Sequence, residues 1–479
     1  MTAVRCNSTA VSFFYKCCNV HVMPFEPLTA VSSVDGRYRA ITEQLVDYFS
    51  EFALIRARVR VECEYLIALT ETEGVGVRKL TDEEKASLRT IAHASLEDAK
   101  AIKTIEKETN HDVKAVEYFL KQKIKGTSLE DVSEWVHFGL TSEDINSVAY
   151  GLLLREALEK VFLPEFERIR SVLNALTAEH TATPMLARTH GQPASPTTFG
   201  KEMKVFASRL ERQYVGLTKL PILVKLGGAT GNFNAHNVAL PDVDWQVFAD
   251  NFIEHLNAGS PIKLERNPVT TQIESHDTYA ELFDNMRRIN TILIDFSQDM
   301  WRYISDGWIV QKVKEGEVGS SAMPHKVNPI DFENAEGNLG IANALFNHFS
   351  NKLPISRLQR DLSDSTVERS FGTAFAHSLI AYRSLGKGFE KVKVNETAML
   401  EALQAHPEVL AEGIQTVLRA NGAEMPYEKL KELTRGKQVT LEDLRTFIDG
   451  LDTTDDIKKR LKELRPETYI GLASDIAKR

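Results

Sequence analysis

Cysteine is scarce in this sequence of 479 residues, which contains only Cys6, Cys17, Cys18 and Cys63. Because no cysteine follows Cys63, we expect neither a disulfide framework nor a cysteine-based zinc site in the body of the chain. This usage is typical of a reducing compartment, and we predict a cytoplasmic protein. No set of His, Asp and Glu has convincing metal-ligand spacing, so no metal ion is expected.

Glycine and proline, with 26 and 16 residues, are also infrequent, which disfavours disordered, collagen-like and turn-rich all-β proteins. No stretch approaches the roughly 18 uninterrupted apolar residues of a membrane span, so we expect no membrane association. A basic excess is missing too, because 58 Lys and Arg face 67 Asp and Glu, for a net charge of −9. This balance argues against nucleic-acid binding, whereas anionic small molecules need only a local cluster of cations.

Helical periodicity dominates what is present. From Tyr279 to Trp308 apolar residues recur every three or four positions, and no Gly or Pro interrupts residues 276–306. A helix of this length spans about 45 Å, which favours a long-helix bundle assembled from several chains. Strand-like alternation is rare, with one possible short hairpin near 222–233. Helix is also predicted for residues 40–70, 150–180, 199–217, 331–350 and 373–391.

Breaks between these helices divide the chain. Segments rich in Pro, Gly or Asn, at 184–196, 225–241 and 314–329, separate the strongest helical patterns. The first 22 residues lack acidic residues and fit a disordered extension, a start site upstream of Met23 or a weak targeting segment. We therefore expect an all-α protein with this extension at 1–22 and three helical domains, at 23–130, 131–389 (the central bundle) and 390–479.

The segment 314–329 combines groups that chemistry can use. It contains the hydroxyls of Ser320 and Ser321, the cation of Lys326, and glycines that permit movement. A mobile lid that carries a nucleophile or a base has this composition. A plain helix–loop–helix connector, in which the prolines only stop the helices, has it as well.

A family resemblance decides between these alternatives. Residues 319–329 read GSSAMPHKVNP, which closely resembles the signature loop of the fumarase/aspartase superfamily. Histidine in MPHK and glycine in the RTHGQPA segment at 188–194 resemble the adenylosuccinate lyase branch, as does PYEKLKELTRGK at 426–437. The likeness covers the chain from about residue 28 onward. Further family motifs follow in the expected order: DGRY at 35–38, NHDVKAVEYFL at 110–120, TSEDIN at 141–146, TTQIESHD at 270–277 and RDLSDSTVER at 360–369.

The resemblance implies a β-elimination that breaks a C–N bond and releases fumarate. Such a reaction needs a base for a C–H proton, an acid for the departing nitrogen, and cations around a doubly charged intermediate. The family's base corresponds to Ser320, whose hydroxyl would need desolvation, amide donors and the charge of Lys326. The general acid corresponds to His190, because imidazole exchanges protons near neutral pH.

The resemblance also assigns the contacts of a substrate with one phosphate and two carboxylates, groups that suit arginine. Each residue taken singly could be a cap or turn residue, since TSED at 141–144 reads as a capping box. The roles of His276 and His325 stay open. The implied substrate contacts are Arg37, Tyr38, Asn110, His111, Asp112, Thr141, Ser142, Gln272, Ser321, Lys326, Asn328, Asn334, Arg360, Ser365 and Arg369.

The activity that follows from the resemblance is that of an adenylosuccinate lyase in purine biosynthesis, without a cofactor. It would release fumarate from adenylosuccinate, giving AMP, and from succinylaminoimidazole carboxamide ribotide (SAICAR), giving AICAR. The resemblance also implies a homotetramer whose active sites are shared between subunits. Three alternatives remain: another superfamily lyase such as argininosuccinate lyase or a cycloisomerase, a catalytically retired structural homologue, and a nucleic-acid-binding module, which the acidic balance disfavours.

Overall fold

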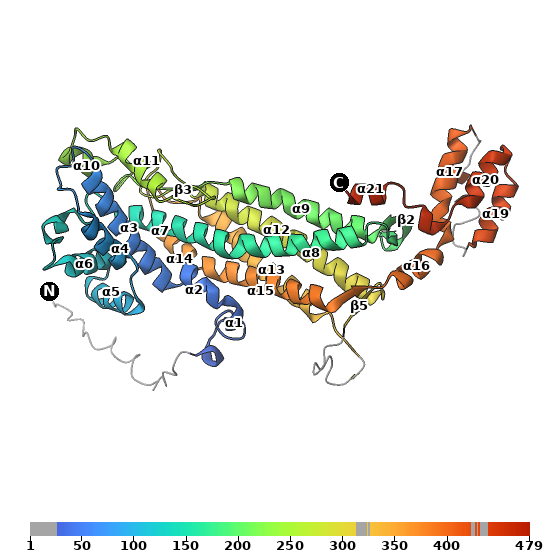
Figure 1. Ribbon diagram of the computed structural model, residues 1–479, viewed down its shortest axis with the longest axis horizontal. Helices are drawn as coiled ribbons and strands as arrows, with labels where there is room; N and C mark the ends of the chain where they lie inside the picture. The colour runs from blue at the N-terminus through green and yellow to red at the C-terminus, as the bar shows by residue number, and fades with distance from the viewer. Residues whose placement is uncertain (1–25, 313–322, 324–325, 423–426, 429, 432–438) are drawn as a thin grey trace, which may run out of the picture.

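The computed structural model describes residues 26–312, 323, 326–422, 427–428, 430–431 and 439–479. Long helices run side by side along one axis and form an elongated bundle (Figure 1). The expected all-α fold is confirmed. The bundle helices are α7 (Ser142–Ala157), α8 (Leu163–Glu179), α9 (Phe199–Lys219), α12 (Asp277–Ser305), α13 (Ile330–Lys352) and α15 (Phe371–Lys391).

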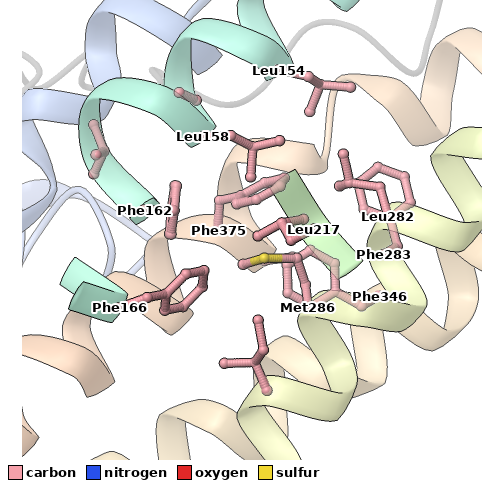
Figure 2. Packing of buried hydrophobic residues seen from close by; sticks show 14 of the residues in the cluster. Leu154, Leu158, Phe162, Phe166, Leu217, Leu282, Phe283, Met286, Phe346 and Phe375 are labelled. Carbon is pink, nitrogen blue, oxygen red and sulfur yellow. The ribbon is translucent and has the colours of Figure 1, made fainter. Parts of the chain in front are cut away.

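The longest helix, α12, confirms the prediction for residues 276–306. Its 29 residues span about 43 Å, and its apolar stripe is buried against α9 and α13. Figure 2 shows Phe283 and Met286 of this stripe converging with Phe346 of α13 and Phe375 of α15. Trp308 is buried too, but it follows the helix in the next turn. The bundle core therefore comes from the apolar periodicity that the sequence displays.

Helices α7 and α8 form one continuous run. Their 16 and 17 residues are joined by a π-helical turn of five, Leu158–Phe162, which precedes Pro164. Proline lacks an N–H, and a local change in helical pitch accommodates the missing hydrogen bond. The run is about 57 Å long. It extends along the bundle, with α6 (Asp112–Ile124) and α14 (Ser363–Glu368) near one end and β2 (Gln192–Thr198) near the other (Figure 1).

Shorter helices cover the two ends of the bundle. The predicted helix at 40–70 is interrupted at Ser50, whose hydroxyl accepts a hydrogen bond from the Ala53 N–H at 3.0 Å and caps α3. A separate apolar cluster joins α3 to α4, α5 and α6. A third cluster lies among α17, α19 and α20. The bounds are α1 Arg39–Thr42, α2 Val46–Phe49, α3 Glu51–Glu71, α4 Asp82–Ala92, α5 Leu96–Thr109, α10 Asn234–Ala239, α11 Trp245–His255, α16 Glu396–Gln404, α17 Ala411–Ala420, α19 Leu441–Asp449, α20 Asp455–Glu463 and α21 Ala473–Ala477.

The described part of the chain contains three two-stranded sheets, which differ from the predicted strands. The hairpin predicted near 222–233 is wrong, because β3 (Ile222–Val224) pairs in parallel with β4 (Leu264–Arg266), and a glycine-rich loop follows Val224. An antiparallel hairpin forms instead between β1 (Pro184–Thr189) and β2. We did not predict this hairpin because its strands contain prolines, which usually interrupt strands. An edge strand tolerates proline, because an N–H on its open side is not needed for pairing. The last pair is β5 (Ile309–Gln311) with β6 (Val392–Val394).

Candidate active site

Two helix N-termini meet at one end of the bundle. His111 is the N-cap of α6, and its Nδ1 accepts a hydrogen bond from the Lys114 N–H at 3.2 Å. The other ring nitrogen, Nε2, lies 3.5 Å from the Ser142 hydroxyl in the first turn of α7. Thr141 caps α7, as the TSED pattern indicates. Because helix N-termini carry partial positive charge, this corner suits an anionic ligand.

Arg369 joins the same corner from the segment after α14. Its Nη2 lies 3.7 Å from Asp112 Oδ2, and its Nη1 donates to the Ser365 carbonyl at 2.9 Å. Burial favours a neutral Asp112, but the charges of Arg58 and Arg369 outweigh it and lower the pKa of this carboxyl. A cavity of about 270 Å³ adjoins Asp112 and Arg369, with Phe49 and Leu54 on its apolar side. The corner therefore combines a fixed negative charge with an accessible guanidinium.

A buried ion pair lies at the N-terminus of α7. Asp144 and Lys225 are fully buried, with Lys225 Nζ 2.7 Å from Asp144 Oδ1. The same carboxylate accepts hydrogen bonds from the Thr141 N–H at 2.8 Å and from the Gly227 N–H at 2.7 Å. Gly228 has a φ of +78°, a conformation that favours glycine. The glycine-rich loop after β3 is thus tied to the N-terminus of α7.

Arg360 lies among buried carboxylates. Its Nη2 is 3.0 Å from Glu143 Oε2, and its Nε is 3.5 Å from Asp364 Oδ2. His276, in a left-handed conformation with φ 61° at the N-cap of α12, lies 3.5 Å from Glu368. Burial opposes protonation of His276, yet the hydrogen bond and charge of Glu368 raise its pKa. Three carboxylates thus share one guanidinium and one imidazole.

The buried cluster favours the neutral form of Glu143. Burial and the neighbouring Glu368 carboxylate raise the pKa of Glu143 to about 8, despite Arg360. Between its ordinary pKa of 4.5 and about 8, the folded chain binds a proton that the unfolded chain has lost. Stability therefore decreases as pH rises through this window.

Glu143→Gln is expected to remove this pH dependence. Glutamine keeps an oxygen that can accept a hydrogen bond from Arg360, and it does not titrate. The free energy of unfolding of the variant therefore lacks a pH-dependent contribution of up to about 1.4 kcal/mol per pH unit. Thermal unfolding at pH values spanning the window measures it. The melting temperature of the wild type should fall more steeply with pH than that of the variant, and parallel curves would contradict the assignment.

A second group of predicted residues lies where α13 begins. Asn334 Nδ2 donates a hydrogen bond to the Tyr38 hydroxyl at 2.9 Å, and Asn334 Oδ1 accepts one from Ser384 at 2.8 Å. Arg37 is exposed beside Tyr38, with its guanidinium 6.0 Å from the ring centre. Lys326 is exposed just before α13. The DGRY motif is thereby brought to the helix that follows the signature loop.

His190 lies at the opposite end of the bundle. It is exposed in the turn between β1 and β2, with a φ of 52°, and Gly191 follows with a φ of 74°. The hairpin packs against α16 and α21, and Ser195 on β2 donates a hydrogen bond to Glu412 of α17. The α7–α8 run of about 57 Å separates the Ser142 end from this hairpin. Within one chain, His190 does not meet the corner at His111 and Arg369.

Comparison with known proteins supplies the family. Residues 36–342 match the family described as lyase, and residues 356–470 match the family described as adenylosuccinate lyase C-terminal. The adenylosuccinate lyase of Vibrio cholerae serotype O1 is 51% identical over 457 residues, covering 95% of this chain and 99% of the relative. That of Dictyostelium discoideum is 51% identical over 461 residues, covering 94% and 97%. The chain belongs to the adenylosuccinate lyase family. The family predicted from the motifs is confirmed, and the protein is a lyase.

Solved structures support the fold of this adenylosuccinate lyase family member. A fumarate lyase from Mesorhizobium sp. BNC1 superposes with a TM-score of 0.72 at 19% identity, covering 91% of this chain and 96% of that one. The 3-carboxy-cis,cis-muconate lactonizing enzyme from Pseudomonas putida gives 0.70 at 20% identity, covering 92% and 96%. At these identities both similarities support the fold alone.

The predicted site residues fall into separate places in the chain. Asn110, with a φ of 52°, ends α5 beside His111, and Gln272 is half-buried in the segment before α12. Asn328 is half-buried just before α13. Ser320, Ser321 and His325 lie outside the described residues. The corner, the α13 group and the His190 hairpin are thus three distinct parts of one subunit.

Sequence reasoning missed the residues that support the corner. Arg58 contacts Asp112, and Glu143 contacts Arg360. Asn146 joins Arg58 to Glu143, and none of these three residues was predicted. No sequence signal singles out Arg58, because it alternates with Arg56 and Arg60 in the same helical segment. Its burial in the structure distinguishes it, since a buried arginine needs polar partners.

Proposed function

We propose that this lyase converts adenylosuccinate to AMP and fumarate, and SAICAR to AICAR and fumarate, in purine biosynthesis in the cytoplasm. The observation that carries the proposal is the corner formed by His111, Ser142 and Arg369, next to which Arg360 pairs with Glu143. Such a substrate carries a phosphate and two carboxylates, and guanidinium groups bind both kinds of anion with paired hydrogen bonds. The helix N-termini of α6 and α7 add partial positive charge in the same place.

The elimination needs two proton transfers on opposite sides of the bond that breaks. Ser320 would remove the proton from the carbon next to a carboxylate, with the charge of Lys326 lowering the cost of its alkoxide. The electron pair then forms the C–C double bond of fumarate as the C–N bond breaks. His190 would donate a proton to the departing nitrogen. Arg360, Arg369 and the hydroxyls of Ser142 and Ser321 would hold the anionic groups throughout.

Such a site requires several subunits. His190 and the His111 corner lie at opposite ends of a helical run of about 57 Å, so both can reach one substrate only if different chains supply them. An antiparallel pairing of bundles would bring the hairpin of one subunit beside the corner of another. We therefore propose a homotetramer with active sites shared between subunits.

The surface of α13 supports close packing between subunits. Gly337 and Gly340 are exposed in the helix interior, and a Cβ built on either meets nothing within 4 Å. Glycine in a helix interior costs about 1 kcal/mol relative to alanine. Ile341, 49% exposed, lies on the same face. Small residues beside an exposed isoleucine fit a helix of another subunit that approaches closely.

The experiment that tests the function is a direct assay. Purified protein is mixed with adenylosuccinate or SAICAR, and fumarate release is followed by ultraviolet absorbance. Turnover of both substrates and none of argininosuccinate is the expected result. Cleavage of argininosuccinate instead would assign another superfamily activity. Absence of fumarate from every succinyl compound would assign a retired homologue.

A further inference from the structure

Arg58 is a buried cation in the middle of α3. It is 4% exposed, and its guanidinium makes two directed contacts with different helices. Nη2 donates to Asp112 Oδ2 of α6 at 2.8 Å, and Nε donates to Asn146 Oδ1 of α7 at 2.9 Å. A buried guanidinium is costly to desolvate unless its partners are well placed. Asp112 is a predicted substrate contact, and Asn146 lies about one helical turn after the predicted contact Ser142.

Asn146 connects Arg58 to Glu143, which pairs with Arg360. Its Oδ1 accepts from Arg58, while its Nδ2 donates to Glu143 Oε2 at 3.3 Å. Glu143 in turn holds Arg360 at 3.0 Å. An amide suits this place because it accepts from a cation on one side and donates to a carboxyl group on the other. Neither Glu143 nor Asn146 is exposed, so solvent does not replace these contacts.

The contacts of Arg58 and Asn146 belong to one connected series of side-chain contacts. It begins at Arg369, passes Asp112, Arg58, Asn146 and Glu143, and ends at Arg360. Its ends are both predicted substrate arginines. Of its four middle members, Asp112 lies on α6, and the other three lie on the helices α3 and α7. We propose that Arg58 and Asn146 are positioning residues, which set the separation and orientation of Asp112, Arg369 and Arg360 without touching substrate.

The proposal rests on the proposed function, because it assumes that the arginines bind the substrate's anionic groups. Groups that bind a phosphate and carboxylates must match their spacing, and a displacement of about 1 Å can lower a rate by roughly 10²-fold. Lysine cannot replace Arg58, since a single ammonium on a flexible stem does not direct two hydrogen bonds along the planar fork of a guanidinium.

Arg58→Lys is therefore expected to lower kcat/KM by about 10- to 100-fold, mainly through KM, with the fold and the oligomeric state retained. The chain offers a matched control two residues along α3. Arg60 pairs with Glu156 of α7, Nη1 to Oε1 at 2.8 Å, but it does not belong to the series of side-chain contacts that leads to Arg360. Arg60→Lys should retain wild-type kinetics. Equal activity of the two variants would overturn the proposal.

A second readout distinguishes positioning from general stability. Asp112 faces Arg58 of α3, Arg369 after α14 and the adjacent His111. The acidic groups that line the same cavity are Glu51 of α3, Glu106 of α5 and Glu368 of α14. In Arg58→Met the strongest cationic neighbour is gone, so the pKa of Asp112 should rise. The acid limb of kcat/KM should then move to higher pH, whereas Arg60→Met should leave it in place. An unmoved limb would contradict the proposal.

Asn146→Leu covers the case in which the Arg58 variants fold poorly. It removes both amide hydrogen bonds at similar side-chain volume and leaves every charge in place. A raised KM for adenylosuccinate, with a normal far-ultraviolet circular dichroism spectrum, is expected, and unchanged kinetics would refute the proposal. Failure of the proposed function is a separate result, because it would show as a wild type that releases no fumarate.

Discussion

Replacement of His190 by asparagine is expected to lower kcat by about 10²- to 10⁴-fold, the usual contribution of a general acid or base. His190 occupies the turn of the β1–β2 hairpin with a φ of 52°. Asparagine tolerates this left-handed conformation better than alanine does, so His190→Asn removes the imidazole while preserving the turn. The loss can then be attributed to proton transfer.

The measurement compares kcat and KM for adenylosuccinate in the wild type, His190→Asn and a control, His255→Asn. His255 is an exposed histidine at the end of α11, far along the chain from the hairpin. It should be replaceable without effect. KM should change little in His190→Asn, because the arginines hold the anionic groups. Retention of wild-type kcat would remove His190 from the acid role.

Long-range apolar periodicity made the bundle predictable. In α12 the residues that recur every three or four positions are the buried ones, because a bundle helix presents one face to its neighbours. The strands were less predictable. Ile222–Val224 is too short to show alternation, and its partner at Leu264 comes from about 40 residues away. Local pattern carries no information about a partner at that separation.

The site was predictable only as far as the motifs reached. His111, Ser142 and Arg369 come from three distant motifs, and the structure brings them to one corner. The supporting residues were not predicted, because a buried guanidinium such as Arg58 is recognised by its partners on other helices. The separation of His190 from this corner follows from the length of the α7–α8 run, which no single motif contains.

Mixtures of inactive subunits provide the decisive experiment on this separation. His190→Asn and Arg369→Gln should each be poorly active alone, since one lacks the proton donor and the other an anion-binding guanidinium. In hybrid tetramers some sites would take intact His190 from one chain and intact Arg369 from another. Random mixing of equal amounts should restore about a quarter of wild-type activity, the product of two independent halves for residues from different subunits.

The matched control pairs two residues of the same corner. His111→Asn keeps a good N-cap for α6. His111 and Arg369 of the same subunit both contact Asp112. Because each site needs both residues from a single subunit, mixing His111→Asn with Arg369→Gln should restore nothing. Subunits are exchanged under mild denaturant, exchange is verified by mass labelling, and fumarate release is assayed. If exchanged tetramers of His190→Asn and Arg369→Gln stay as inactive as the same-corner pair, the site lies within one chain, and the bundle must bend or refold to bring His190 to the corner.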